Sequence, residues 1–294
     1  MMSWILYTRR KLKLRIKADT YLQENIRHIL EDGYMDENPR PKYKDGTPAH
    51  TYSVNHIFRT YNLAAGEFPI TTLRPIAWKT GIKEILTIYQ KPTNDISEME
   101  KMGVTWWSDW DIGDGTIGQR YGATVSRYDL INNLIKDIQL DPYGRRKVVS
   151  LWQETDLRET PGLAPCAFLT IWNVREKYLD MCMIQRSGDM LTASGAGGIN
   201  EVQYTALLMM IARHCGYEPG VFSHFVANEQ IYDRHVDQAR KLVQRYWGTL
   251  SKHPVNPRLV LNTDTKDFYD ITIDDFTMEN YTPLKPQLKL ELGI

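Results

Sequence analysis

Residues 163–189 read LAPCAFLTIWNVREKYLDMCMIQRSGD, and the interpretation of the whole chain begins from this stretch. Within it, residues 166–172 and 179–185 have the β-branched and aromatic content of strands. Two such strands in close succession predict a β-hairpin, with Cys166 at the start of the first strand and Arg186 just after the second. The hairpin could therefore place a guanidinium beside a thiol.

A cation next to Cys166 would favour the thiolate, which is the nucleophilic form of cysteine. A free thiol, with a pKa of about 8.5, is only a few per cent ionised at pH 7. A lone cysteine in a strand is nevertheless most often a small core residue, so spacing alone does not make Cys166 catalytic. Cys182 and Cys215 have apolar neighbours and are interpreted as core residues.

Other parts of the chain also have strand composition. Residues 147–152 and 221–232 are rich in β-branched and aromatic side chains, and residues 258–261 and 270–276 add two late strands. Several of these strands follow one another directly along the chain. This order predicts an α+β fold built around a large, mainly mixed sheet.

Three segments have the pattern of helices. They cover residues 77–89, residues 128–140 and residues 201–214, and Gly216 is a suitable C-terminal stop for the last of them. Residues 37–48 are charged and rich in proline, which predicts a loop.

Composition excludes several classes of protein. The 294 residues carry 36 basic and 36 acidic side chains, and a net charge of zero argues against a general binder of nucleic acid or anionic membranes. With 42% hydrophobic residues the chain can build a core, but its longest clean apolar run, residues 206–212, is too short to cross a bilayer.

Three cysteines without a CxxC pair suggest a reducing compartment. At the N-terminus the apolar residues 4–7 precede the basic run, the reverse of a signal peptide, so a cytoplasmic location is expected.

Two segments resemble ligand-binding motifs but lack the residues that those motifs require. Residues 109–118 (DWDIGDGTIG) resemble a calcium loop, but Gly113 and Arg120 stand where carboxylate ligands belong. Residues 194–198 (SGAGG) lack the ending of a phosphate loop and the spacing of a dinucleotide fingerprint. No histidine has zinc-site spacing. Neither a metal nor a nicotinamide cofactor is expected.

Taken together, a series of motifs resembles the thymidylate synthase family from about residue 20 to the C-terminus. The motifs are DGTPAHT at 45–51, TT at 71–72, WSDW at 107–110, YG at 121–122, RR at 145–146, APC at 164–166, QRSGD at 185–189, an Asn-x3-Tyr at 200–204, DFYD at 267–270 and the terminal Ile294. The resemblance implies one domain over residues 1–294 with a two-layer α/β sandwich around the sheet. It also implies reductive methylation of dUMP to dTMP with 5,10-methylenetetrahydrofolate, in a homodimer whose arginines are shared across the interface.

The resemblance assigns roles to matching residues. Cys166 is the expected nucleophile toward C6 of the pyrimidine, Glu84 organises proton movement near O4, and Tyr121 helps to remove the C5 proton. Arg186 is counted with both the catalytic and the phosphate-binding residues. The other expected dUMP ligands are Arg40 (with Lys42 and Lys44 as rivals), Arg145, Arg146, Ser187, Asp189, Asn200, Gln230 and Tyr232. The expected folate contacts are Trp107, Trp110, Asp189 and Ile294.

The sequence departs from the family pattern at four places. Ala167 follows the nucleophile where many members have His, and Gln230 replaces a His that contacts the sugar. The segment 192–199 is about three residues longer than its counterpart, and Leu73 stands where many members have Lys. The last two changes affect the expected folate side of the site.

Two other functions remain open on the sequence. A pyrimidine-nucleotide hydroxymethylase of the same family shares the first steps and lets water complete the reaction, and an inactive homologue could be retained for binding. Trp107 favours methylation over water capture, and Asn200 favours uracil over cytosine, because an amide can both donate to O4 and accept from N3–H.

Overall fold

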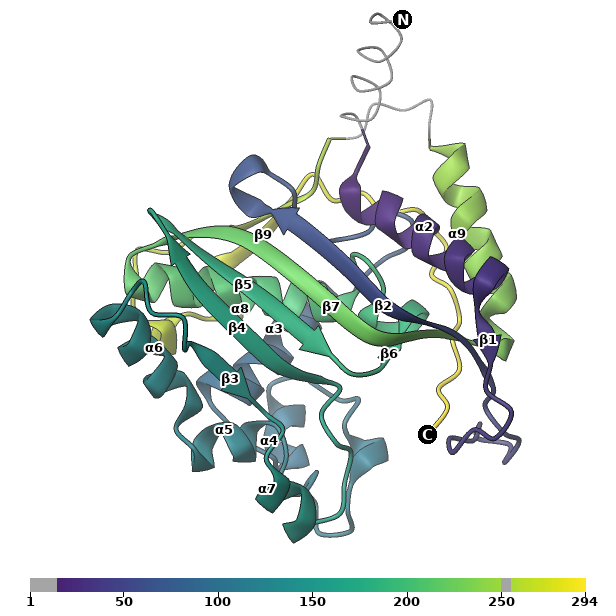
Figure 1. Ribbon diagram of the computed structural model, residues 1–294, viewed down its shortest axis with the longest axis horizontal. Helices are drawn as coiled ribbons and strands as arrows, with labels where there is room; N and C mark the ends of the chain where they lie inside the picture. Colours follow the sequence, from purple (N-terminus) through teal and green to yellow (C-terminus); the bar gives the residue numbers. More distant parts are fainter. Residues whose placement is uncertain (1–14, 250–254) are drawn as a thin grey trace, which may run out of the picture.

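A computed structural model describes residues 15–249 and 255–294, so the apolar N-terminal segment 4–7 lies outside the described residues. A mixed sheet of seven strands forms the centre of the fold, as predicted (Figure 1). Its strands are β1 (Tyr34–Met35), β2 (Thr51–Asn62), β3 (Val148–Ser150), β4 (Ala167–Arg175), β5 (Tyr178–Gln185), β6 (Gly188–Asp189) and β7 (Glu218–Tyr232). The order is β1-β2-β7-β5-β4-β3, with β6 paired to β7. Neighbours are antiparallel except for the β5–β7 and β6–β7 pairs.

The predicted hairpin is the β4–β5 pair. Ala167 lies opposite Gln185, and the register shifts between Ala167 and Leu169, which marks a bulge where β4 begins. The long β7 then runs parallel to β5 on one side and antiparallel to β2 on the other. Cys166 and Arg186 therefore lie side by side at the end of the hairpin, next to β6.

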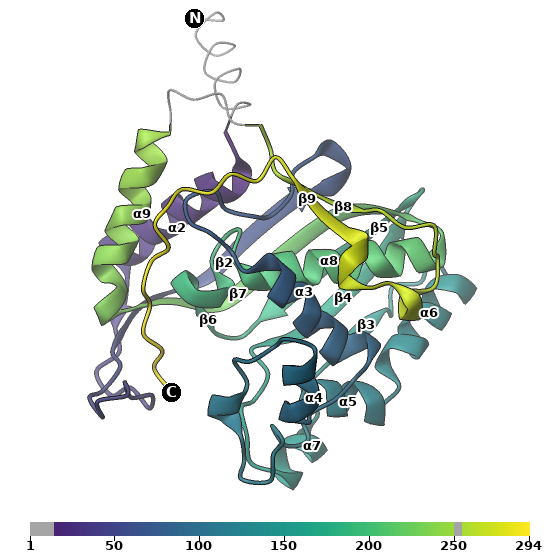
Figure 2. The same ribbon diagram turned by 180° about the vertical axis from the view of Figure 1, so that it is seen from behind.

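One face of the sheet is covered by helices. The predicted helix at 201–214 is α8 (Ile199–Cys215), which is buried over most of its length and ends at Gly216 with a left-handed φ of 79°. α3 (Trp78–Ile85), which continues into the π turn Leu86–Gln90, packs against α8 on the face of the sheet that is turned toward the viewer in Figure 2. α6 (Leu130–Leu140) confirms the helix predicted at residues 128–140. The shorter helices are α4 (Ile96–Lys101), α5 (Gly122–Arg127) and α7 (Glu154–Glu159).

Two long amphipathic helices were not predicted. α2 (Lys17–Asp32) buries Leu22, Ile26 and Ile29, and it packs against α9 (Val236–Gly248) beside β2 (Figure 1). The spacing of these three side chains, four and three residues apart, places them on one face of the helix. The spacing is therefore a sequence signal for this helix.

The prediction of a strand at 270–276 is wrong. Residues in this segment form 3-10 turns, Phe268–Asp270 and Ile273–Asp275, and β9 (Phe276–Glu279) begins only where the predicted strand should end. Thr272 and Asp275 form a capping box, in which short polar side chains bond to the backbone and favour a turn over a ladder. β9 pairs with β8 (Arg258–Leu261), which is where a strand was predicted.

No described helix covers the other face of the sheet, which carries a row of apolar side chains (Figure 1). Phe58, Phe225, Ile184 and Leu169 are paired in register across β2, β7, β5 and β4, and thus form one row. Phe58 is 57% exposed, and the other three are only partly buried. Among the described residues no helix is long and apolar enough to cross a membrane.

Candidate active site

A cleft of about 1170 Å³ opens where β5, β6 and the end of β7 meet α3, α8 and the C-terminal residues. Thirteen of the fifteen predicted site residues line it. They are Arg40, Glu84, Trp107, Trp110, Tyr121, Cys166, Arg186, Ser187, Asp189, Asn200, Gln230, Tyr232 and Ile294. Residues spread over most of the chain thus converge on one cavity, which is the behaviour expected of a binding site.

The Cys166 thiol lies in this cleft beside the Arg186 guanidinium. Arg186 Nη2 donates to Cys166 Sγ at 3.5 Å, and the same guanidinium is held by the carbonyls of Pro165 (3.0 Å) and Ala164 (2.8 Å). The expected neighbour is therefore present. Burial nevertheless raises the pKa of the Cys166 thiol, although the charges of Arg186 and Arg40 oppose that shift. The loss of hydration on burial thus has a larger effect on the thiol than the two guanidinium charges.

This balance predicts how the free protein reacts with alkylating agents. Since only the thiolate reacts, and since the pKa of Cys166 is raised, modification of Cys166 by iodoacetamide should still be accelerating above pH 9. The measurement is the rate of carboxamidomethylation at Cys166, followed by peptide mass at several pH values. Arg186→Met should slow the reaction further at each pH. A rate that is already constant between pH 7 and 9 would contradict the assignment.

Glu84 is a buried carboxylate surrounded by donors. Trp106 Nε1 (2.8 Å) and Trp107 Nε1 (2.6 Å) both donate to its Oε1, and Gln203 Nε2 donates to Oε2. Burial raises the pKa of Glu84, and these three hydrogen bonds only partly oppose the shift. A carboxyl group with a raised pKa inside a cleft suits proton transfer. Trp106 and Gln203 were not predicted as site residues, because nothing in the local pattern links them to Glu84.

Tyr121 stands at the start of α5 in a strained backbone conformation. Its φ is 49°, which is unfavourable for a bulky side chain and is found where the surroundings impose it. Its ring packs edge-on against Trp107, with 4.9 Å between centroids. Burial, and next the charge of a Cys166 thiolate, raise the pKa of the Tyr121 phenol well above its ordinary value.

The predicted phosphate-binding residues divide into two groups. Arg40, Arg186 and Ser187 line the cleft, whereas the rivals Lys42 and Lys44 do not. Arg145 and Arg146 are exposed on a loop after α6 and lie outside the cleft.

That loop is held in place by a buried lysine. Lys147 is 2% exposed, and its Nζ donates to the carbonyls of Asp141 (2.5 Å) and Gly144 (2.6 Å). Arg145 and Arg146 are therefore presented on an ordered loop that points to the outside of the chain.

The C-terminus closes one side of the cleft. Ile294 exchanges two backbone hydrogen bonds with Lys42, at 2.9 and 3.0 Å, two residues from Arg40. Tyr232 donates to the Gly293 carbonyl at 3.4 Å, and burial raises the pKa of Tyr232 to about 12. The last residues and the loop that carries Arg40 thus form one wall.

The lengthened segment 192–199 is folded into the protein. Asp189 accepts from the backbone N–H groups of Leu191 (3.2 Å) and Thr192 (3.3 Å) and so begins a π turn. Gly197 has a φ of 66°, and a Cβ there would lie 2.2 Å from the backbone nitrogen of Thr71, so only glycine fits. Thr192 and Ala193 line the cleft, so this longer segment still forms part of its wall.

A mixed sheet, with a cysteine thiol and a buried carboxylate lining one cleft, is an arrangement typical of enzymes that use a thiol nucleophile. The comparisons with known proteins agree. The family model described as thymidylate synthase matches residues 19–294. The thymidylate synthases of Streptococcus suis and Lactococcus lactis subsp. cremoris are each 49% identical, over 95% and 94% of this chain and 99% of theirs. A solved structure, the thermostable thymidylate synthase A from Bacillus subtilis, has a TM-score of 0.85 and 33% identity, over 94% of this chain and 99% of that one.

The chain belongs to the thymidylate synthase family. It is therefore a methyltransferase of that family, and the match covers nearly its whole length. These relatives bear the name of the synthase, which supports methylation and gives no support to the hydroxymethylase alternative.

Proposed function

We propose that the protein methylates dUMP to dTMP, with 5,10-methylenetetrahydrofolate as co-substrate and dihydrofolate as the second product. The observation that carries this proposal is the placing of Cys166, Arg186, Glu84 and Tyr121 around one cleft. An assay with dUMP and methylenetetrahydrofolate tests it directly. Product mass distinguishes dTMP from a hydroxymethylated nucleotide, and an inactive homologue would give neither product.

Each residue has a definite task in this reaction. The Cys166 thiolate attacks C6 of the pyrimidine, and the negative charge that develops toward O4 makes C5 nucleophilic. Arg186, which is 3.5 Å from the sulfur, has a guanidinium that also suits a phosphate, so it can hold the nucleotide beside Cys166. Glu84 holds or moves a proton near O4, and Tyr121 assists removal of the proton from C5. Once C5 has bonded to the one-carbon unit and lost its proton, delivery of the hydride to that carbon would break the C6–S bond and release the Cys166 thiolate.

The cleft suits a folate co-substrate. Trp107 and Trp110 pack edge-on against each other, 5.6 Å between centroids, and both line the cleft, where they offer aromatic surface to a pterin ring. Asp189 and Ile294 line the same cavity. When bound, methylenetetrahydrofolate supplies the one-carbon unit and the hydride. Among the described residues no group of histidine, cysteine and carboxylate side chains could hold a metal ion.

We propose that Asn200 recognises the pyrimidine base, and a substitution at this residue tests the assignment. Asn200→Asp should lower kcat/KM for dUMP and raise it for dCMP, since a carboxyl group can be protonated to match cytosine N3 and N4. Loss of one matched polar contact costs about 1–3 kcal/mol, or about 5- to 150-fold. The measurement is the ratio of kcat/KM for the two nucleotides. A ratio equal to that of the unmodified protein would exclude Asn200 as the base reader.

We also propose a homodimer with shared sites. The uncovered apolar row on the sheet and the outward Arg145 and Arg146 support it, because both features need a second chain to become useful. In the dimer these two arginines would reach the phosphate bound by the other chain. All three cysteines are free, which supports a reducing compartment, and we propose the cytoplasm.

A further inference from the structure

Asn200 lies between two glutamines that bond to opposite ends of its amide. Asn200 Nδ2 donates to Gln203 Oε1 at 2.9 Å, and Gln185 Nε2 approaches Asn200 Oδ1 at 3.5 Å. An asparagine amide can rotate by half a turn and exchange its donor and acceptor, and the two orientations match different bases. Which orientation Asn200 adopts therefore depends on what fixes the two glutamines.

Gln203 is fixed by Glu84. It is 2% exposed, and its Nε2 donates to Oε2 of the Glu84 carboxylate. The other oxygen of Glu84 already accepts from the indoles of Trp106 and Trp107, which can only donate. An ionised carboxylate only accepts, so while Glu84 is ionised Gln203 turns its NH2 group toward Glu84 and its carbonyl oxygen toward Asn200.

Gln185 is fixed from the opposite side. It is 3% exposed, and its Nε2 donates to the Ser187 carbonyl at 3.0 Å. Its Oε1 then faces His224 Nε2 at 3.1 Å, which requires a hydrogen on that ring nitrogen. The orientation of Gln185 thus depends on the protonation pattern of His224.

The buried Arg59 determines that pattern. Arg59 Nη2 lies 2.9 Å from His224 Nδ1, and a guanidinium can only donate, so Nδ1 accepts and the hydrogen is on Nε2. Burial, and next the charge of Arg59, lower the pKa of His224 to about 4, so the ring is neutral at pH 7. Glu201 Oε1, which is 3.0 Å from Nδ1, accepts instead from Arg59 Nε at 2.7 Å. A protonated ring would still carry a hydrogen on Nε2, so the direction toward Gln185 would be unchanged.

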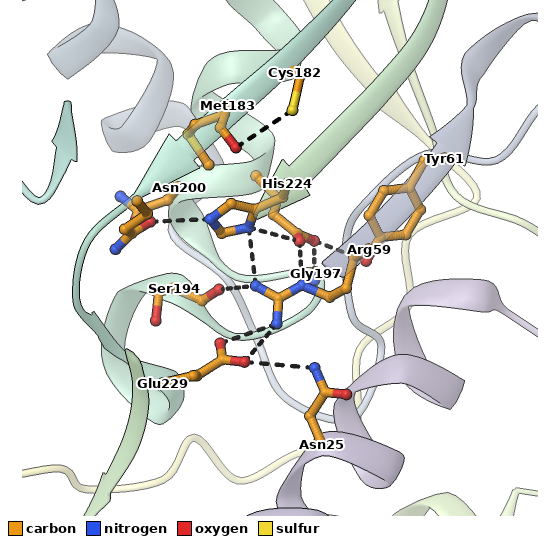
Figure 3. A network of polar contacts seen from close by, with 12 residues as sticks. Asn25, Arg59, Tyr61, Cys182, Met183, Ser194, Gly197, Asn200, His224 and Glu229 are labelled. Carbon is orange, nitrogen blue, oxygen red and sulfur yellow. Dashed lines mark hydrogen bonds and ion pairs between the residues drawn. The ribbon is translucent and has the colours of Figure 1, made fainter. Parts of the chain in front are cut away.

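Hydrogen bonds from several sides fix the orientation of the Arg59 guanidinium (Figure 3). Its Nη1 donates to both oxygens of Glu229, at 3.0 and 2.7 Å, and its Nη2 also donates to the Ser194 carbonyl at 2.6 Å. Arg59 comes from β2, Glu229 from β7 and Ser194 from the lengthened segment before α8. The anchor of the chain of hydrogen bonds therefore includes the segment that departs from the family pattern.

We propose that the hydrogen bonds from Arg59 through His224, Gln185, Asn200 and Gln203 to Glu84 all run in one donor-to-acceptor direction and thereby select uracil over cytosine. In this arrangement Asn200 Nδ2 faces Gln203 and donates to O4 of uracil near Glu84. Asn200 Oδ1 faces Gln185 and accepts from N3–H of uracil. Cytosine needs the reverse orientation. His224 and Gln203 are thus positioning residues, and this inference rests on the proposed use of dUMP.

The test compares dissociation constants of dUMP and dCMP for the full-length protein and its variants. His224→Phe removes the donor to Gln185, and Gln203→Met removes the contact that holds Asn200 Nδ2. Each should reduce the preference for dUMP about 5- to 150-fold. His224→Gln should retain the preference, since a carboxamide can accept from Arg59 and donate to Gln185. Glu229→Gln is the matched control: it weakens the same buried cluster and lowers the melting temperature, but it leaves the donor direction intact and should not change the preference.

The outcomes separate the two proposals. Unmodified protein that makes no dTMP from dUMP would overturn the proposed function. If the unmodified protein makes dTMP, and His224→Phe and Gln203→Met both fold but keep its base preference, the relay is wrong. A loss of preference in His224→Gln as large as that in His224→Phe would also refute it, because the donor direction would then be irrelevant. Loss of preference in Glu229→Gln would show that cluster stability, and not direction, controls the base.

Discussion

Cys166→Ala should lower turnover at least about 10,000-fold, because it removes the atom that bonds to C6. Cys166→Ser should be nearly as inactive, since a hydroxyl is hardly ionised at neutral pH and the Arg186 guanidinium cannot compensate for so large a difference in pKa. Cys182 and Cys215 do not line the cleft, so their alanine variants should retain most activity and are the controls. Steady-state rates of the four variants check this prediction.

Covalent trapping gives the same prediction an independent readout. With 5-fluoro-dUMP and methylenetetrahydrofolate, attack at C6 and transfer of the one-carbon unit can occur, but fluorine at C5 cannot leave as a cation. The step assigned to Tyr121 then has no proton to remove, and the adduct should persist. Intact mass should show a chain heavier by both ligands in the unmodified protein and in Cys215→Ala, with no such gain in Cys166→Ala. Trapping that survives in Cys166→Ala would refute the assignment of the nucleophile.

The elements that could be predicted are those with a strong local pattern. The β4–β5 hairpin and α8 follow from composition and from the stop at Gly216, and both are confirmed. Residues 270–276 were assigned wrongly because polar side chains bond locally to the backbone there, which composition does not reveal. Local pattern therefore predicts elements with strong strand or helix composition and fails where side chains bond to the backbone.

The site could be predicted only as far as its motifs reach. Cys166 and Asn200 were identified by family motifs, and both line the cleft. Arg59 and His224 were not identified, because the contact between them joins positions 165 residues apart and has no local signature. Gln203, whose partner Glu84 is 119 residues away, was missed for the same reason. Such contacts are made by the packing of β2, β7, α3 and α8 and become visible only in three dimensions.

Arg145 and Arg146 lead to the second large effect, which concerns the dimer. Neither residue lines the cleft of its own chain, although both match phosphate ligands of the family. If they serve the partner's site, Arg146→Ala should inactivate the site on the other chain, whereas Cys166→Ala inactivates the site on its own chain. Neither homodimer should then have useful activity.

Mixing the two inactive proteins should restore activity. Half of the dimers formed after random exchange of equal amounts contain one chain of each kind, and in each of these one of the two sites has both an intact Cys166 and an intact Arg146. The expected recovery is about one quarter of the unmodified activity. The measurement is dTMP formation before and after mild denaturation and renaturation of the mixture, with subunit exchange verified by a mass tag on one variant. Arg145→Ala combined with Arg146→Ala on the same chain cannot complement itself and serves as the control. Confirmed exchange without recovery would mean that each site uses arginines of its own chain, and the exposed loop after α6 would then need a different role.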